Sequence, residues 1–392
     1  MSAPTEEKKA DAETAPALTT ETPAAEQSAT ATESAAAEKT ETDKPAASTT
    51  DEATKPEPAA DIAAEGEASK TDEAAKPDVP AKDEAPAKPS EAAAAPAWPE
   101  ISDDHPINKL LKALPDLITG ADGYNEVYGI HLDPTGPFHT KLILQKFLRA
   151  NANDVDKAKN QLAETLKWRG SFKPLAALDE AFAKDRYEGL GYVIEAEGVP
   201  ESPNKKDIIT FNIYGAVKDN KATFGDVEAE AVAFGRTSDM REKLPHFTHK
   251  FLRWRVALME MGIKKLNLAN ATQPIPDYGN GPDPYQGIQV HDYLSVSFIR
   301  QDPNVKAASR RTIDLFSKVY PETLSRKFFV NVPVVMGWMF QTFKLILPKE
   351  TTRKFTVLSY GNQLASELGP NVPEVYGGKT GGLETIGEQT KF

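Results

Sequence analysis

Apolar positions recur with a helical period over the middle of the chain and with a different period further on. From Thr140, Leu144, Phe147 and Leu148 share one face of a first predicted helix. In a second predicted helix the apolar residues are three or four apart, at Val155, Ala158, Leu162 and Leu166. Asn153 or Asp154 is placed to cap the second of these helices, and Gly170 to end it. Residues 103–136 mix short apolar runs with Pro and Gly, so we expect short helices joined by turns there. The pattern predicts a helical lobe over residues 101–187.

Beyond Gly189 the pattern changes to short β-rich runs separated by helical candidates. The strand candidates are 192–195, 207–214, 286–297, 328–332 and 355–358, and the helix candidates are 226–235, 247–265, 305–318 and 334–347. Strands that alternate with helices favour a mostly parallel sheet with crossover helices. The sequence therefore predicts an α/β domain over residues 188–385, followed by a C-terminal tail at 386–392.

The first 100 residues have a different composition from the rest. They hold 30 Ala and 12 Pro, and their 23 acidic and nine basic side chains give a net charge of −14. Before Trp98 the only large apolar residues are Met1, Leu18, Ile62 and Val79. Such a segment cannot bury enough apolar surface to offset the entropy of ordering, so we expect a disordered acidic tail over residues 1–100.

Composition also narrows the class of protein. The chain has no Cys, which excludes disulfides, thiolate metal sites and cysteine nucleophiles. No stretch reaches the roughly 20 apolar residues that span a bilayer, and the start lacks the basic and apolar regions of a secretory signal. We therefore expect a cytoplasmic protein.

The strand candidate 286–297 carries polar and titratable side chains along one face. Because side chains alternate across a strand, one face holds Ile288, Val290, Asp292, Leu294 and Val296, and the other holds Gln289, His291, Tyr293, Ser295 and Ser297. The strand candidate 207–214 shows the same alternation, with Thr210, Asn212 and Tyr214 on its polar face. Two interpretations stay open: a ligand-lined concavity, or an ordinary half-exposed strand.

The run 334–347, between Pro333 and Pro348, is apolar almost all round a helix. At 14 residues it would extend only about 21 Å, too short to cross a membrane. It is typical of a buried core helix. The alternative is a lid over an apolar cavity that meets a membrane surface when it opens.

Signals for other chemistry are weak. His246 and His249 are three apart, but no third ligand has motif spacing, which favours surface histidines over a metal site. No G-x-S-x-G, Walker or Rossmann motif occurs, and Lys306, Arg310 and Arg311 are too few for a nucleic-acid face. We expect neither an enzyme nor a nucleic-acid partner.

Four motifs, in order and spacing from about residue 105 to 385, resemble the CRAL-TRIO lipid-binding family. They are Lys146-Phe147-Leu148-Arg149-Ala150, Trp168-Arg169, Val330-Asn331-Val332-Pro333 with the apolar run after it, and Val375-Tyr376-Gly377-Gly378. The resemblance implies an α/β CRAL-TRIO fold with a helical N-terminal lobe. It also implies a mostly parallel sheet that floors a hydrophobic pocket, closed by a gate helix at 334–347 with Trp338, Phe340 and Phe343.

Within the family the chain is most similar to fungal phosphatidylinositol transfer proteins of the Sec-fourteen type, and among these to the haem-binding fifth-homologue group. The residues that carry this likeness are Val290-His291-Asp292-Tyr293 and Phe328-Phe329-Val330-Asn331-Val332-Pro333. The likeness implies that Glu322 and Lys354 contact the lipid headgroup. It further implies haem b as a cofactor, with Tyr293 as the iron ligand and with Tyr214, Arg255, His291 and Lys327 around the porphyrin.

The resemblance thus leads to one main interpretation and one alternative. The first is a phosphatidylinositol-binding and transfer protein that also holds haem through a tyrosinate, linked to phosphoinositide homeostasis. It would be a monomer that associates peripherally and transiently with endoplasmic reticulum or microsomal membranes. The alternative is a haem-dependent oxidoreductase, or a haem sensor or buffer, without a role in lipid transfer.

Overall fold

The computed structural model describes residues 96–225, 250–276, 279–297, 302–334 and 354–392, all of which belong to one compact unit. The predicted helix at 226–235 and the proposed gate residues Trp338, Phe340 and Phe343 lie outside the described residues. Among the described helices, none has the length and apolar character that a membrane span needs.

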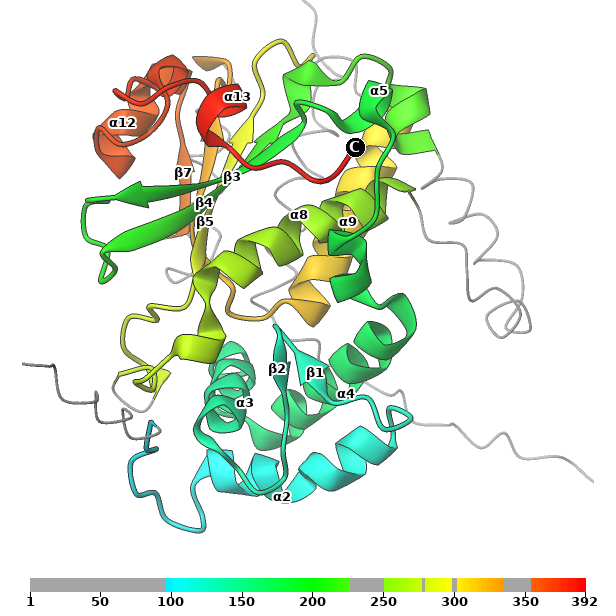
Figure 1. The fold of residues 1–392 in the computed structure, drawn as a ribbon, viewed down its shortest axis with the longest axis vertical. Helices are drawn as coiled ribbons and strands as arrows, with labels where there is room; N and C mark the ends of the chain where they lie inside the picture. The colour runs from blue at the N-terminus through cyan, green and yellow to red at the C-terminus, as the bar shows by residue number, and fades with distance from the viewer. Residues whose placement is uncertain (1–95, 226–249, 277–278, 298–301, 335–353) are drawn as a thin grey trace, which may run out of the picture. The chain divides into compact units, whose positions relative to one another are not determined.

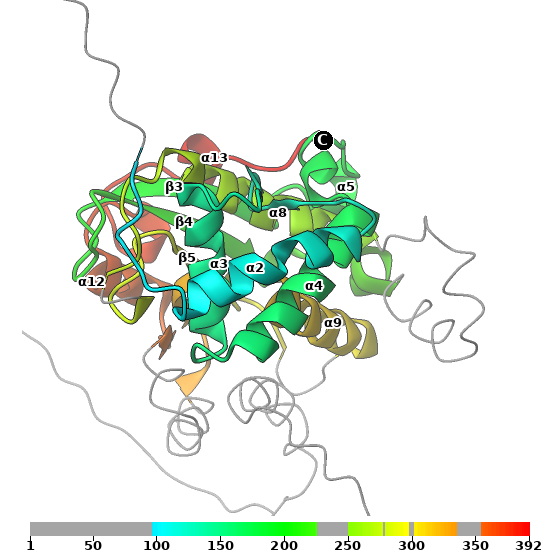
Figure 2. The ribbon, with the colours of Figure 1, turned by 90° about the horizontal axis from the view of Figure 1, so that it is seen from below.

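Three helices and a short hairpin form the N-terminal lobe. They are α2 (Pro106–Thr119), α3 (Phe138–Ala150) and α4 (Val155–Phe172), with strands β1 (Glu126–Val127) and β2 (Ile130–His131). The three helices pack against one another (Figure 2). Their apolar stripes meet in a core that includes Leu110, Leu114, Leu144, Phe147, Leu162 and Leu166. The helical period read from the sequence is therefore confirmed.

Two local predictions in this lobe are wrong. Residues 103–136 form one 14-residue helix, with Pro115 inside it, and a hairpin, because burial of Leu110, Leu114 and Leu117 outweighs the one hydrogen bond that a proline removes. Gly170 does not end α4, which continues to Phe172. A Cβ on Gly170 would lie 3.2 Å from the ring of Tyr124, so this glycine serves close packing instead.

The sheet contains five strands in the order β3-β4-β5-β6-β7. Their bounds are β3 (Gly191–Glu197), β4 (Lys206–Ile213), β5 (Gly287–Asp292), β6 (Leu324–Val330) and β7 (Phe355–Val357). Figure 1 shows this sheet, with β3, β4, β5 and β7 labelled. The pair β3–β4 is antiparallel and the other three pairs are parallel, so the predicted mostly parallel sheet is confirmed. Strand β5 is shorter than predicted because the chain turns after Asp292, whose carboxylate accepts from the backbone N–H of Leu294.

Different partners cover the two faces of the sheet. Ile209, Phe211, Val290 and Phe328 point to α12 (Leu364–Leu368) and the residues after it. The opposite face meets α8 (Lys250–Leu266), which packs on β3, β4 and β5, and α9 (Pro303–Val319) packs against α8. The polar side chains of β4 and β5 lie on this second face.

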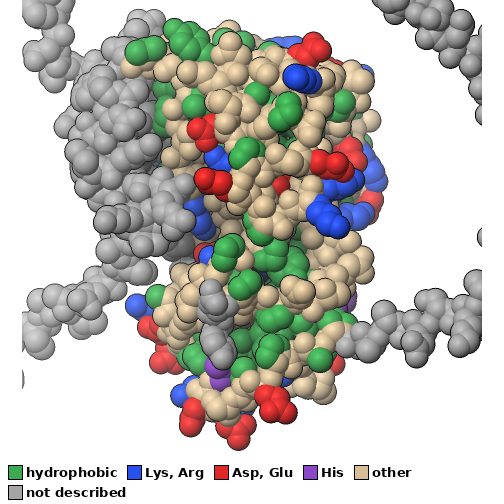
Figure 3. Space-filling view, turned by 90° about the vertical axis from the view of Figure 1, so that its left-hand side faces the viewer, with side chains coloured by type: hydrophobic (Ala, Val, Ile, Leu, Met, Phe, Trp, Pro, Cys, Tyr) green, Lys and Arg blue, Asp and Glu red, His purple; other side chains and the backbone are tan. Residues whose placement is uncertain are grey.

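The remaining elements are short connections. They are η1 (Pro174–Leu178), α5 (Lys184–Tyr187), η2 (Tyr214–Ala216), η3 (Leu268–Asn270), η5 (Gly361–Gln363), η6 (Glu374–Tyr376) and α13 (Leu383–Ile386). On the molecular face in Figure 3, acidic and basic side chains lie beside one another rather than in separate patches.

Buried charges connect the helical lobe to the sheet domain. Arg169 of α4 donates from Nη2 to Glu126 Oε1 at 2.8 Å and from Nη1 to Glu260 Oε1, on α8, at 2.7 Å. The Nζ of Lys146 on α3 donates to Asp283 Oδ2 at 2.7 Å and to the carbonyl oxygen of Glu322 at 2.8 Å. These side chains are almost completely buried, so each charge depends on its partners.

The C-terminal residues are docked on the sheet domain. Val193 of β3 and Glu388 exchange backbone hydrogen bonds of 2.9 and 3.0 Å. The indole N–H of Trp254 donates to Thr390 Oγ1 at 3.1 Å, and the N–H of Phe182 donates to the carbonyl oxygen of Lys391 at 2.8 Å. Residues 388–392 therefore take part in the folded structure.

A pair of truncations should locate the start of the folded part. The Trp98 ring lies 5.3 Å from the Phe138 ring, so residues just before 101 already contribute apolar packing. A chain that begins at residue 96 should keep the free energy of unfolding of the full chain to within about 0.5 kcal/mol. A chain that begins at residue 101 should lose about 1 kcal/mol, since it lacks this aromatic contact. Urea unfolding of the three chains measures both values, and equal stability of the two truncated chains would contradict the expectation.

Candidate functional site

The carboxyl ends of β4 and β5 bring three of the predicted haem residues together. Strands β4 and β5 are neighbours, with Asn212 opposite His291. Tyr214 follows β4 directly, and its ring lies 5.6 Å from that of His291 and 5.2 Å from that of Tyr293. Tyr293 stays on the ladder although β5 ends at Asp292, because its N–H donates to the carbonyl oxygen of Val330 at 3.1 Å. Tyr214, His291 and Tyr293, which the sequence placed on polar strand faces, thus form one aromatic cluster.

Phenylalanines of the next two strands extend this cluster. The Phe329 ring on β6 lies 5.6 Å from His291 and 6.3 Å from Tyr293, and Phe355 on β7 lies 5.9 Å from Phe329. The Nζ of Lys327 is 4.9 Å from the Phe329 ring and 5.8 Å from the Phe355 ring. An ammonium over the face of an aromatic ring is an attractive arrangement. Lys327 therefore places a positive charge beside the cluster.

His291 is buried and hydrogen-bonded on one side of its ring. Its Nδ1 lies 2.8 Å from the hydroxyl oxygen of Tyr214, while its Nε2 has no hydrogen-bond partner among the described residues. Burial lowers the pKa of His291 well below its usual value, and the charges of Lys327 and Arg255 add to this effect. The imidazole is therefore neutral at pH 7.

This buried histidine predicts a particular response to acid. An unfolded histidine has a pKa of about 6.5, so its stabilising effect is complete above that pH and is lost as the pH falls towards the lower folded pKa. Below pH 6.5 the loss should be about 1.4 kcal/mol per pH unit. His291→Asn keeps a polar atom near the position of Nδ1 and removes the titration. Urea unfolding between pH 7.5 and 5 should therefore be steeper with pH for the wild type, and parallel curves would contradict this.

Arg255 supplies a second positive charge from α8. Its guanidinium is buried, donates from Nη2 to Gln289 Oε1 at 3.2 Å, and has its central carbon 5.1 Å from the Phe316 ring. Among the described residues it forms no ion pair with a carboxylate. Burial lowers the pKa of Arg255, and an ionised Tyr214 or Tyr320 would raise it. Negative charge at Tyr214 would therefore be stabilised here.

The two predicted headgroup residues form a second cluster. Glu322 precedes β6 and Lys354 precedes β7, and Lys354 Nζ lies 3.9 Å from Glu322 Oε2. The same carboxylate oxygen accepts from Arg149 Nε at 3.0 Å and from Gln286 Nε2 at 2.6 Å. Glu322 lies before the start of β6 and the Tyr293 N–H bonds Val330 at its end, so these two residues lie towards opposite ends of a strand about 20 Å long at 3.3 Å per residue. Lys354, however, directly precedes Phe355, so the two clusters are neighbours at the start of β7.

Sequence reasoning missed several residues of both clusters. Arg149 was part of a quoted motif, yet its contact with Glu322 crosses 173 positions. Asn212 and Gln289 had a signal, since both lie on the polar faces of predicted strands. Asp292 turns the other way, where its Oδ2 accepts from the Tyr376 hydroxyl at 2.7 Å and its Oδ1 from Asn331 Nδ2 at 2.7 Å. Its carboxylate therefore ties the ends of β5 and β6 to the C-terminal motif.

The described residues contain no group of three or more His, Asp or Glu side chains arranged to hold a metal ion. His246 and His249, which the sequence disfavoured as ligands, lie outside them.

Comparisons with known proteins agree with this architecture. The CRAL/TRIO domain model matches residues 225–378, and the CRAL/TRIO N-terminal domain model matches residues 106–164. A protein of Phaeosphaeria nodorum named phosphatidylinositol transfer protein SFH5 is 59% identical over 298 residues, which cover 76% of this chain and 83% of that protein. A Botryotinia fuckeliana protein of the same name is 48% identical over 289 residues, covering 72% of this chain and 59% of that longer protein.

A solved structure shows the same fold. The crystal structure of Sfh5 has a TM-score of 0.56 with this chain at 28% sequence identity, and the match covers 74% of this chain and 92% of that one. The helical lobe, the mostly parallel sheet, the two domain models and these relatives agree, and the chain belongs to the CRAL-TRIO family.

Proposed function

We propose that this protein binds phosphatidylinositol and transfers it between membranes. The relatives at 59% and 48% identity are named as phosphatidylinositol transfer proteins. The observation that carries the proposal is the pair Glu322 and Lys354, which lie 3.9 Å apart although 32 positions separate them. In this proposal the protein acts as a monomer at the surface of endoplasmic reticulum or microsomal membranes, in phosphoinositide homeostasis.

The chemistry of this pair suits an inositol phosphate. An ammonium neutralises a phosphate, and a carboxylate oxygen accepts hydrogen bonds from inositol hydroxyls. The Lys354 side chain is 32% exposed, whereas that of Glu322 is 15% exposed. Arg149 and Gln286 hold the carboxylate in place. The lysine thus offers a reachable charge next to a fixed acceptor.

Transfer between vesicles tests this assignment. Lys354→Met removes the charge that would pair with the phosphate, so we expect phosphatidylinositol transfer to fall by about tenfold. Phosphatidylcholine carries the same phosphate but has no inositol hydroxyls that would hold its headgroup at Glu322 beside Lys354, so its transfer should change much less. Lys379→Met is the matched control, because it removes an exposed lysine elsewhere on the chain. Equal effects of the two variants on phosphatidylinositol transfer would contradict the assignment.

The gate helix expected at 334–347 gives a second test, which stays a prediction from sequence. Trp338→Asp with Phe340→Asp should reduce transfer of both lipids by more than about tenfold, because a carboxylate opposes entry into a bilayer. The double variant should lose transfer of both lipids, whereas Lys354→Met should lose transfer of phosphatidylinositol alone. This difference separates membrane docking from headgroup recognition. Unchanged transfer by a folded double variant would refute the gate.

We propose haem as a second ligand, at the aromatic cluster. The residues fit this group: Tyr293 offers a phenol, Lys327 offers a charge suited to a propionate, and Arg255 would stabilise negative charge at Tyr214 beside Tyr293. The unpartnered Nε2 of His291 is a buried polar atom that a bound group could satisfy. Bound haem would supply iron-based ligand binding or electron transfer. An absorption spectrum of the protein purified from cells tests whether it binds haem. Peroxide turnover by the haem-containing protein then separates an oxidoreductase from a haem sensor or buffer.

A further inference from the structure

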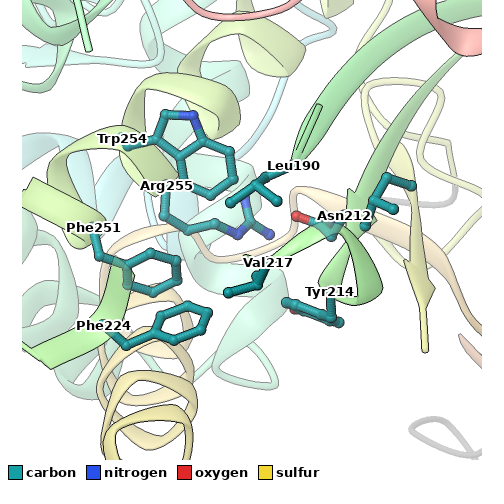
Figure 4. A pocket seen from close by; sticks show the side chains of 9 residues that line it. Leu190, Asn212, Tyr214, Val217, Phe224, Phe251, Trp254 and Arg255 are labelled. Atoms are coloured by element: carbon teal, nitrogen blue, oxygen red, sulfur yellow. The ribbon is translucent and has the colours of Figure 1, made fainter. Parts of the chain in front are cut away.

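A small cavity lies between the end of β4 and α8, beside the aromatic cluster. Its volume is about 10 Å³. Figure 4 shows the side chains that line it, which are Leu190, Asn212, Ile213, Tyr214, Val217, Phe224, Phe251, Trp254 and Arg255. Most of this lining is apolar, so the two strongly polar side chains, Asn212 and Arg255, decide what the cavity can hold.

One polar atom of each of these two side chains lacks a partner in the described structure. Asn212 Oδ1 and Arg255 Nη1 are both buried without a hydrogen bond, although both residues are at least 97% buried. The first is an acceptor and the second is a donor, so they are complementary. In Figure 4 the oxygen of Asn212 points towards the guanidinium of Arg255.

The other ends of both side chains are already engaged. Asn212 Nδ2 donates to the carbonyl oxygen of Val290 at 3.2 Å, which fixes the amide with its oxygen on the opposite side. Arg255 Nη2 donates to Gln289 Oε1 at 3.2 Å, which fixes the plane of the guanidinium. Neither side chain can therefore turn to satisfy its free atom without breaking a bond that it makes.

We propose that this cavity binds one water molecule, which accepts from Arg255 Nη1 and donates to Asn212 Oδ1. A cavity of about 10 to 15 Å³ holds one water, and such waters are stable where they meet polar partners. A phosphate or carboxylate is too large for this volume. A buried guanidinium with an unsatisfied N–H is unfavourable, and the water removes that cost.

The bridge has a consequence for the haem site, and this step rests on the proposed haem function. Through the water, Asn212 becomes a positioning residue for Arg255, whose charge lies next to Tyr214. The proposed water links Asn212, on β4, to Arg255, on α8. Asn212 also bonds Val290 and Arg255 also bonds Gln289, both on β5. Strands β4 and β5 would therefore together hold the guanidinium of Arg255 in place.

Filling the cavity distinguishes a bound water from a dry apolar space. Val217→Ile adds one methylene, which would stabilise a dry cavity but would expel a water and leave two polar atoms without partners. In the full chain we expect Val217→Ile to lower the Tm by about 3 °C. In a chain that also carries Asn212→Leu and Arg255→Met, the same substitution should leave the Tm unchanged or raise it, because no polar atom is stranded.

This cycle cancels any steric strain from the added methylene, since strain acts in both backgrounds. An equal change of Tm in the two backgrounds would overturn the proposal. A crystal structure of the full chain that resolves ordered waters gives the direct readout. It should show one peak within hydrogen-bond distance of both Asn212 Oδ1 and Arg255 Nη1, and a cavity without density would also overturn the proposal.

The positioning role has its own measurement on haem-loaded protein. The ferric charge-transfer band of Asn212→Leu should move towards that of Arg255→Met, since both variants leave Tyr214, whose ring lies 5.2 Å from that of Tyr293, without a fixed cation. An unmoved band in Asn212→Leu would refute positioning. If the wild type bound no haem while the Tm cycle and the water peak came out as expected, the haem proposal would fail and the water site would stand.

Discussion

Replacing Arg169 with Met should lower the free energy of unfolding by about 3 to 5 kcal/mol, because removal of one partner leaves buried carboxylates without a counter-charge. The Arg169 side chain is 0% exposed, and those of Glu126 and Glu260 are 3% and 1% exposed. Tyr320 also donates to Glu260 Oε1 at 2.7 Å, so the charge lies inside a hydrogen-bonded network. Methionine fills much of the space but neutralises neither acid.

A lysine with two exposed carboxylate partners provides the control. Lys265 bonds Glu195 and Glu388, which are 44% and 63% exposed, and Lys265→Met should cost less than about 1 kcal/mol. Adding Glu126→Gln and Glu260→Gln to Arg169→Met should restore part of the stability, since no buried charge then remains. Urea unfolding measures all of these variants. A loss below about 1 kcal/mol for Arg169→Met would show that the two carboxylates find other partners.

Tyr293→Phe should reduce ferric haem binding by about 100-fold or more, beyond the 10–100-fold that loss of an outer-shell partner typically costs. The substitution keeps the ring and its contacts with Tyr214 and Phe329, and removes only the phenol oxygen. Phosphatidylinositol transfer should survive, because the substitution removes no atom of Glu322 or Lys354 and keeps the Tyr293 ring in place. Haem titration followed by absorbance measures the affinity.

His291→Ala is the matched comparison, because His291 lies two residues earlier, about 7 Å along the strand. It should weaken binding or alter the spectrum without abolishing the tyrosinate signature. An unchanged haem content and charge-transfer band in Tyr293→Phe would show that Tyr293 does not bind iron.

Local patterns in the sequence predicted the elements, because spacing along the chain decides which face a residue occupies. Asp154 caps α4 by accepting from the N–H of Lys157 at 3.0 Å, as its position indicated. The alternation over 288–292 likewise placed His291 and Asp292 on opposite faces. The order of the strands had no such local signal, so the adjacency of Asn212 and His291 came only from the structure.

Contacts between distant segments account for what sequence could not supply. Gly170 had the spacing of a helix end, but the nearby Tyr124 ring gives it a packing role. Arg255 was named through family resemblance, whereas its support by Gln289 and the orphaned oxygen of Asn212 depend on how α8 lies on the sheet. Such three-dimensional neighbours leave no periodic trace along the chain.

The backbone bridge between Val193 and Glu388 also affects aggregation between copies of this protein. Strand β3 is the first strand in the sheet order, and an uncovered outer strand offers its N–H and C=O groups to any other chain. The C-terminal residues occupy part of that border. Proteolytic removal of these residues would expose the backbone groups of β3 to strand addition by another chain. We therefore expect residues 388–392 to protect the protein against aggregation.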